Sequence, residues 1–302
     1  MCEYKMIDSP AMALDYGIRD YELKDKDKSV ESGYIIEKEK KTYWNYLSND
    51  AWGEFIKNMK PIHQLQFEDA DGGEMKEKKG RWGIYPPKMA SFGSSSRFLY
   101  NVSKDIEGFQ FEKLLPTRVG HSANLDGYLM RGDVDVFVEA KCKEIYSSHK
   151  IVEISNVYKE IYQELKKKYT KFSYEAKSSK DKDHFNCTFI LDEKPIVHFD
   201  IKQLICHFLG ISANILENQK ANTNIRFVYI LFNPNHNTSF NNEQTLSYKE
   251  KIKSIYNETI KEIENFGDMK DLFDAVMEIQ KERLSLPKKK YTFKFYNELF
   301  TY

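Results

Sequence analysis

Hydrophobic and polar residues alternate along the segment 123–141, and this period of two predicts a pair of short strands. The runs 124–129 and 134–141 are rich in aromatic and β-branched residues, and Arg131-Gly132-Asp133 between them is a turn signal. We therefore expect a β-hairpin. Strand alternation places four side chains of its second strand on one face: Asp135, Phe137, Glu139 and Lys141.

Elsewhere, hydrophobic residues recur at steps of three and four, which predicts amphipathic helices. The segments are Lys41–Met59, Ile151–Tyr169, Phe199–Leu216, Asn241–Phe266 and Asp268–Leu284. Ser94-Ser95-Ser96 supplies N-cap residues for a further helix that begins near Arg97. Ile225–Phe232 has the continuous apolar character of a strand buried on both faces, and Tyr291–Phe300 is expected to be a closing strand. Hairpin, helix, buried strand and further helices together predict an α/β fold with a mixed sheet.

The composition of the chain excludes some classes of protein. The chain has 302 residues, of which 41% are hydrophobic and 14% aromatic, and this suits a folded protein with a substantial core. Lys and Arg balance Asp and Glu at 46 each, which excludes a general basic coat for nucleic acid. Four widely spaced cysteines form no CxxC pair, and neither a signal peptide nor a membrane span is apparent. We expect a reduced, cytoplasmic protein.

The triplet Glu-x-Lys carries little information alone, because it occurs eight times in this lysine-rich chain. Glu-Ala-Lys itself occurs twice, at Glu139–Lys141 and at Glu175–Lys177. The second copy lies in polar sequence, whereas the first ends an apolar strand. A Glu and a Lys fixed on a rigid strand beside a core call for an explanation, so the first copy is the candidate for chemistry.

The predicted hairpin brings Asp126 opposite Glu139, with Lys141 on the same face. Two carboxylates suit Mg²⁺, a hard cation that takes few protein oxygens and keeps several waters. A divalent cation promotes ionisation of water near neutral pH, and an ammonium offsets charge that develops on a phosphate. This constellation therefore points to hydrolysis of phosphodiesters. A strand-edge salt bridge without a metal is the alternative.

Asp126 followed by Glu139-Ala140-Lys141 resembles the signature of the PD-(D/E)XK phosphodiesterase superfamily. The resemblance covers roughly residues 94–235. It implies a restriction-endonuclease-like core, with a mixed central sheet flanked by helices, and N- and C-terminal helical additions. Residues 1–93 would be a partly helical extension, 146–198 a helical lysine-rich insertion, and 236–302 helices and a closing strand packed on the core. Leu125 replaces the usual Pro before the first Asp.

The resemblance also implies roles for individual residues. Asp126, Glu139 and the backbone carbonyl of Ala140 would hold Mg²⁺, for which Mn²⁺ is expected to substitute, and Lys141 would position the attacking water. Glu112 is similar to an acid that the family often carries on its first core helix. Gln203 matches the Gln of a Gln-x-x-x-Tyr motif on the second core helix, with His207 in place of Tyr.

Within this superfamily, the chain looks most like a type II restriction endonuclease, a hydrolase that cuts double-stranded DNA and leaves 5′-phosphate ends. Cutting of both strands would favour a homodimer. Arg97 and the run Lys166-Lys167-Lys168 are candidates for phosphate contacts, although a solvated helix face explains the run equally well. Two rival functions remain open: a DNA-repair or RNA-processing nuclease with the same site, and a non-catalytic nucleic-acid-binding or scaffold protein.

Overall fold

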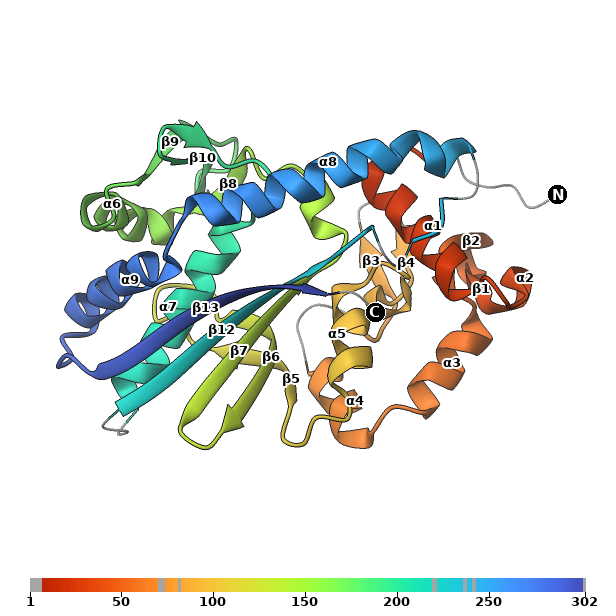
Figure 1. The fold of residues 1–302 in the computed structure, drawn as a ribbon, viewed down its shortest axis with the longest axis horizontal. Helices are drawn as coiled ribbons and strands as arrows, with labels where there is room; N and C mark the ends of the chain where they lie inside the picture. Colours follow the sequence, from red (N-terminus) through yellow and green to blue (C-terminus); the bar gives the residue numbers. More distant parts are fainter. Residues whose placement is uncertain are drawn as a thin grey trace.

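A computed structural model of the chain describes residues 7–69, 74–80, 83–218, 222–235, 238–240 and 243–300. Its centre is a five-stranded sheet with the order β13-β12-β7-β6-β5 (Figure 1). The strands are β5 (Gln110–Leu115), β6 (Ala123–Arg131), β7 (Val134–Lys141), β12 (Asn222–Phe232) and β13 (Lys290–Phe300). β12 runs parallel to both β7 and β13, whereas β5, β6 and β7 are antiparallel neighbours. The predicted α/β class with a mixed sheet flanked by helices is confirmed.

The two faces of this sheet are covered by different helices. Phe227 on β12 contacts Phe208 of α7 (Ile201–Glu217), and Phe208 also contacts Phe273 of α9 (Met269–Leu284). Phe232 projects from the opposite face of β12, because it is five positions further along, and contacts Phe98 of α5 (Ser95–Ser103). The sheet is thus buried between α7 with α9 on one face and α5 on the other.

The hairpin forms where the alternating pattern predicts it. β6 and β7 pair from Arg131↔Val134 to Gly127↔Val138 around a turn in which Gly132 has a φ of 60°. Glycine adopts this left-handed conformation without steric cost, so it permits the tight connection. Phe137 is in register with Phe227, and the face of β7 that carries Glu139 and Lys141 is therefore the face that α7 covers.

Several other predictions are confirmed. α5 begins after Ser94, whose side chain accepts a hydrogen bond from the Arg97 N–H as an N-cap. α7, α9 and α8 (Glu243–Asn265) lie where the helical spacing predicts them, although the start of the predicted segment at Asn241 is outside the described residues. The closing strand β13 joins the central sheet as the neighbour of β12.

The segment between β7 and α7 is less helical than predicted. The prediction of a helix over Ile151–Tyr169 is wrong at its start, where β8 (Val152–Ser155) precedes α6 (Lys159–Lys168). β8 pairs with β10 (His184–Leu191), which also pairs with β9 (Phe172–Ser178) and β11 (Lys194–Pro195). Local spacing resembled a helix, but this long-range pairing decides the conformation. The insertion is therefore a small antiparallel sheet with one α-helix against it, and short 3₁₀ turns at Glu144–Tyr146 and Asn156–Tyr158.

The N-terminal region also corrects one prediction. Lys41–Met59 is not one helix: β2 (Lys41–Leu47) pairs with β1 (Ser32–Ile36), and α3 (Asn49–Lys57) begins after the N-cap Ser48. The Tyr and Trp residues of β2 are good strand formers, and a pairing partner that the pattern could not reveal stabilises them as a strand. The other helices of this region are α1 (Pro10–Glu22), α2 (Lys28–Glu31) and α4 (Pro61–Glu68).

The remaining elements among the described residues of the N-terminal region are a short hairpin and two 3₁₀ turns. The hairpin consists of β3 (Lys78–Gly80) and β4 (Gly83–Tyr85), and the turns are Glu37–Glu39 and Lys88–Ala90. α1 packs along α8, so the N-terminal region contacts the helix that follows β12 in the sequence (Figure 1). Among the described residues, none of the helices has both the length and the apolar character that a bilayer crossing requires.

Candidate active site

Asp126 and Glu139 meet at the point where β6 and β7 begin to separate. The backbone pairing ends at Gly127↔Val138, so Asp126 and Glu139 occupy the next opposed positions. Beyond this point the Ala140 N–H donates a hydrogen bond to the Asp126 side chain, with 2.7 Å between N and Oδ2. The hairpin register predicted from the sequence therefore brings the two acids together as expected. The predicted role of the Ala140 carbonyl stays a prediction.

Lys141 is fixed by Glu139 of the same strand and by Gln203 of α7. Its Nζ lies 2.5 Å from Glu139 Oε1 and donates a hydrogen bond to Gln203 Oε1 at 2.6 Å. His207, one helical turn after Gln203, places Nε2 2.9 Å from Glu139 Oε2. Glu139 is only 1% exposed and His207 only 2%, so β7 and α7 enclose these groups almost completely. The structure thus brings the predicted Gln203 to Lys141 and His207 to Glu139.

Burial and neighbouring charges separate the pKa values of the two carboxyls. Burial, reinforced by the negative charge of Glu139, raises the pKa of Asp126 well above its usual range. Burial alone would also raise the pKa of Glu139, but Lys141 and His207 outweigh it and lower that pKa to about 2. Burial would lower the pKa of Lys141, yet Glu139 and Asp126 raise it well above the usual value. Lys141 is therefore a permanent ammonium beside an ionised Glu139, and Asp126 is the acid that favours a proton.

Glu112 reaches the site from a strand. The expectation that it lies on a first core helix is wrong, because Glu112 belongs to β5 and the helix before it is α5. Its backbone has a φ of 53°, the left-handed region that is uncommon for residues other than glycine. Asn124 Nδ2 donates a hydrogen bond to Glu112 Oε2 at 2.7 Å. Burial, together with the charge of Glu74, raises the pKa of Glu112 to about 7.

Four of these groups border one cavity of about 490 Å³, whereas Glu139 and His207 lie behind its wall. Its wall includes three predicted site residues that carry charge, Glu112, Asp126 and Lys141, and the predicted Gln203. It also includes residues that the sequence analysis did not select: Tyr46, Glu74, Lys88, the serines at the start of α5, Asn124 and Lys143. Strand parity could have found two of them, since Asn124 lies two positions before Asp126 and Lys143 two positions after Lys141.

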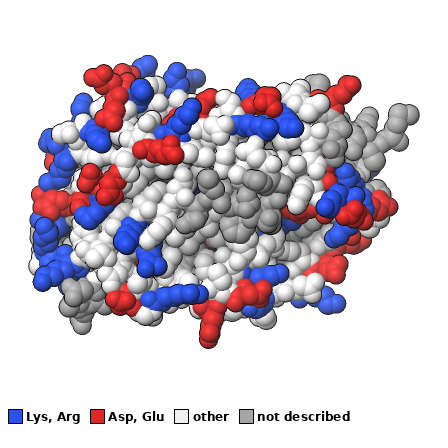
Figure 2. All heavy atoms as spheres, in the orientation of Figure 1, with Lys and Arg blue, Asp and Glu red and all other residues white. Residues whose placement is uncertain are grey.

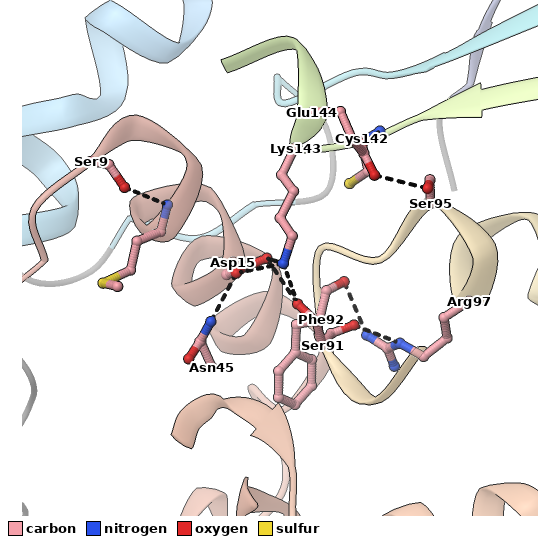
Figure 3. A network of polar contacts seen from close by, with 11 residues as sticks. Ser9, Asp15, Asn45, Ser91, Phe92, Ser95, Arg97, Cys142, Lys143 and Glu144 are labelled. Carbon is pink, nitrogen blue, oxygen red and sulfur yellow. Dashed lines mark hydrogen bonds and ion pairs between the residues drawn. The ribbon is translucent and has the colours of Figure 1, made fainter. Parts of the chain in front are cut away.

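Lys143 ties the site to the N-terminal region (Figure 3). Its Nζ donates to Ser91 Oγ at 2.6 Å and to the Asp15 carboxylate at 3.1 and 3.3 Å, and Asn45 Nδ2 donates to the same carboxylate at 2.8 Å. Asp15 is 3% exposed and comes from α1. A Cβ at Gly93 would lie 2.1 Å from Asp15 Oδ1, so only glycine lets the chain pass so close. Tyr46, Glu74 and Lys88 of the N-terminal region line the same cavity as Lys143.

The nucleic-acid contact candidates have other roles in this structure. Arg97 is 5% exposed, and its guanidinium donates to the carbonyls of Ser91 and Phe92 and to the Glu22 carboxylate. Arg97 thus has buried protein partners in this structure, and its phosphate contact stays a prediction. Lys167 pairs with Glu164 and Lys168 with Glu282 across to α9. Figure 2 shows Lys and Arg interspersed with Asp and Glu on the face in view, as the neutral composition suggests.

The acids of the site are too few to hold a metal ion without water. In the described ranges, no three side chains of His, Cys, Asp or Glu gather into a set that could hold a metal by themselves. Mg²⁺ needs only one or two carboxylates, because it keeps several waters. Both Glu139 oxygens lack an aligned hydrogen bond although Lys141 and His207 lie close to them, and Asp126 is repelled by Glu139. A largely hydrated Mg²⁺ would relieve both conditions, so the residues present fit this ion.

Glu144 lies in the wall of the same cavity, and both of its carboxylate oxygens accept hydrogen bonds from other protein groups. Its Oε1 accepts a hydrogen bond from Ser95 Oγ at 2.9 Å, and its Oε2 accepts one from the Cys142 N–H at 2.8 Å. Cys142 itself is 1% exposed and belongs to the core. Glu144 thus connects the end of β7 to the start of α5.

Comparisons with protein-family models, with curated proteins and with solved structures found no match to this chain.

Proposed function

We propose that the chain is a Mg²⁺-dependent nuclease that hydrolyses phosphodiester bonds of double-stranded DNA. One observation carries the proposal: Asp126 and Glu139 oppose each other at the open end of a hairpin, and Lys141 follows on the same buried face. Supporting it is the element order of helix, three antiparallel strands, helix and parallel strand in α5, β5, β6, β7, α7 and β12. The PD-(D/E)XK resemblance implies the same order.

In this proposal Asp126 and Glu139 would hold the cation, which supplies a positive charge near the scissile phosphate and promotes ionisation of water. Lys141 has no lone pair to offer, because its raised pKa keeps it protonated. It therefore acts as a hydrogen-bond donor to the water or to a phosphate oxygen, and not as a base. Gln203 fixes the direction of that ammonium through its 2.6 Å hydrogen bond. Glu112, which has a pKa of about 7, lies at the same cavity and can accept a proton near neutral pH.

The finer assignment to a restriction endonuclease, with cleavage at a fixed sequence by a homodimer, is also part of the proposal. It follows from the resemblance. Supercoiled plasmid incubated with the purified protein separates the alternatives. Discrete bands that require Mg²⁺ support restriction-type cleavage, and a Mg²⁺-dependent smear supports a nuclease with less sequence preference. Absence of Mg²⁺-dependent cleavage across DNA and RNA substrates would contradict the proposal and favour a binding or scaffold protein.

A matched pair of variants ties any cleavage to this site. Asp126→Asn replaces the half-buried carboxyl at the site by an amide, whereas Asp133→Asn makes the same change in the exposed turn of the same hairpin. We expect Asp126→Asn to lose cleavage and Asp133→Asn to keep it, with EDTA abolishing cleavage by both the wild type and Asp133→Asn. Equal activity of the two variants would show that a contaminant or another site cuts the DNA.

A further inference from the structure

The start of α5 borders the candidate active site with three consecutive serines. Ser94, Ser95 and Ser96 all line the cavity of about 490 Å³ that contains Asp126 and Lys141. Ser94 is the N-cap, so Ser95 and Ser96 are the first two residues of a nine-residue helix. The first backbone N–H groups of a helix have no partner within it, and the helix dipole adds partial positive charge at this end. Such an end is suited to an anion.

Hydrogen-bond donors remain free at this end of the helix. Ser94 Oγ accepts from the Arg97 N–H, and Ser94 O accepts from the Phe98 N–H. Within the described ranges, no acceptor takes the N–H groups of Ser95 and Ser96. The Ser96 side chain is 6% exposed, and its hydroxyl likewise finds no partner in the part of the chain that the structure describes. This hydroxyl belongs to a residue that lines the cavity, so it is available to a ligand there.

Charges around this wall are arranged so that an anion is tolerated. Lys143 borders the same cavity, and although burial opposes it, Asp15 raises the pKa of this lysine, which keeps it charged. The Asp15 carboxylate is itself occupied by Lys143, Ser91 and Asn45 (Figure 3). Both oxygens of Glu144 are engaged, one by the Ser95 hydroxyl and one by the Cys142 N–H. The oxygens of Asp15 and Glu144 are thus occupied by fixed donors, while the α5 amides have no acceptor in the described ranges.

We infer that the N-terminal end of α5 is a phosphate-binding subsite, in which the N–H groups of Ser95 and Ser96 and the Ser96 hydroxyl bind a phosphodiester of the substrate strand. Lys143 supplies the nearby positive charge. The inference rests on the proposed function, because it takes the substrate to be a nucleic-acid strand that passes Asp126 and Lys141. The phosphate bound at α5 would be a different one from the scissile phosphate.

Two pairs of variants isolate the donors. Ser95→Pro removes the Ser95 N–H at the first helical position, where proline is compatible with a helix, and Ser94 already has the extended backbone that proline requires before it. Ser95→Ala is its control, because both variants lose the hydroxyl that contacts Glu144. Ser96→Ala removes the free hydroxyl. Its control is Ser212→Ala, which removes another buried hydroxyl without a partner, on α7 and away from this cavity.

The probe is dimethyl phosphate, a phosphodiester without bases or sugar, titrated into the full chain in EDTA and followed by phosphorus NMR. We expect the wild type to bind in the millimolar range. Ser96→Ala should bind at least about five-fold more weakly than Ser212→Ala, and Ser95→Pro at least about five-fold more weakly than Ser95→Ala, because each loses a hydrogen bond to a charged oxygen. Should Ser95→Pro fail to fold, the Ser96 pair still decides.

Two results would overturn the subsite: no binding of dimethyl phosphate by the wild type, or affinities that agree within each pair. Neither result involves metal or cleavage, so the subsite and the proposed function can fail separately. A protein that cuts DNA with Mg²⁺ but shows no difference within the pairs has the proposed function without this subsite. A protein that cuts nothing but shows both differences keeps the phosphate site and loses the nuclease.

Discussion

The chain contains the same three residues, Glu-Ala-Lys, in two strands, and the structure treats them in opposite ways. In β7 the triplet is buried: Glu139 is 1% exposed, and its carboxylate contacts Lys141 and His207. In β9 the triplet Glu175–Lys177 is exposed at all three positions. The chemical role of the Glu-Ala-Lys triplet therefore depends on the surroundings of its strand, and not on the three residue types alone.

The strands differ in what surrounds them. β7 lies inside the central sheet between β6 and β12, and α7 covers the face that carries Glu139. β9 pairs with β10 in the small sheet, and its triplet faces solvent. A buried ion pair must be compensated by further polar groups, whereas an exposed one is compensated by water. Only the β7 triplet therefore has a fixed geometry that could align a phosphate and a water.

The largest expected effect is on cleavage by lysine variants of the two triplets. Lys141→Ala should reduce the rate of Mg²⁺-dependent plasmid cleavage by about 100- to 1000-fold, because it removes a fixed donor from the reacting centre. Lys177→Ala makes the same change in the same triplet and should cut like the wild type. Initial rates at saturating Mg²⁺, with circular dichroism to check folding, measure both. Full activity of Lys141→Ala would refute the assigned site.

The second effect is on stability. Glu139→Ala leaves Lys141 and His207 buried without their anion, and we expect it to reduce the free energy of unfolding by about 3–5 kcal/mol. Glu175→Ala should change the same quantity by less than about 0.5 kcal/mol, since Glu175 is exposed. Urea unfolding of the two variants in EDTA gives the comparison. Similar losses in both would mean that the buried contacts of β7 add nothing to stability.

The part of this site that could be predicted from the sequence is the part that depends on local pattern. Alternation in β6 and β7 fixes which residues share a face, so the encounter of Asp126 with Glu139 and Lys141 follows from the hairpin alone. Gln203 and His207 are one turn apart on a strongly amphipathic helix, which fixes their common face. These relations span few residues and need no knowledge of the distant chain.

The part that could not be predicted depends on pairing over long distances. Asp15 meets Lys143 across 128 positions of the sequence, and nothing local to either residue signals the other. The N-terminal strand β2 and the insertion strand β8 resemble helices in their spacing, but each forms a strand because a partner is present. Arg97 illustrates the same limit, since the partner of its buried guanidinium, Glu22, comes from another region.

The third expected effect is on the pH dependence of stability, which should differ between the half-buried Glu112 and the exposed Glu175. The pKa of Glu112 is raised from 4.5 to about 7 in the folded protein, first by burial and then by Glu74. Folding therefore favours the protonated carboxyl, so its contribution is intact below about pH 4.5 and is lost as the pH rises through 7.

Glu112→Gln should remove this loss. In EDTA we expect the variant to be more stable than the wild type by about 2 kcal/mol at pH 8, and the difference to shrink toward pH 5. Glu175→Gln is the exposed control and should show no such trend. Thermal unfolding across this pH range measures both. A constant difference between Glu112→Gln and the wild type at every pH would mean that Glu112 does not titrate in this window.

The smallest expected effect is on the salt dependence of DNA binding, through the lysines of α6 outside the site. If the end of α6 contacts DNA phosphates, neutralising Lys166 should lower the slope of log affinity against log salt by about 1. Lys167 and Lys168 are already paired with Glu164 and Glu282, so their neutralisation should lower it by less. Lys177→Gln, from the exposed triplet, is the control. An unchanged slope in all variants rules out a contact by α6, and an equal change for Lys177 would mean that positive charge attracts DNA over the whole insertion without a defined contact.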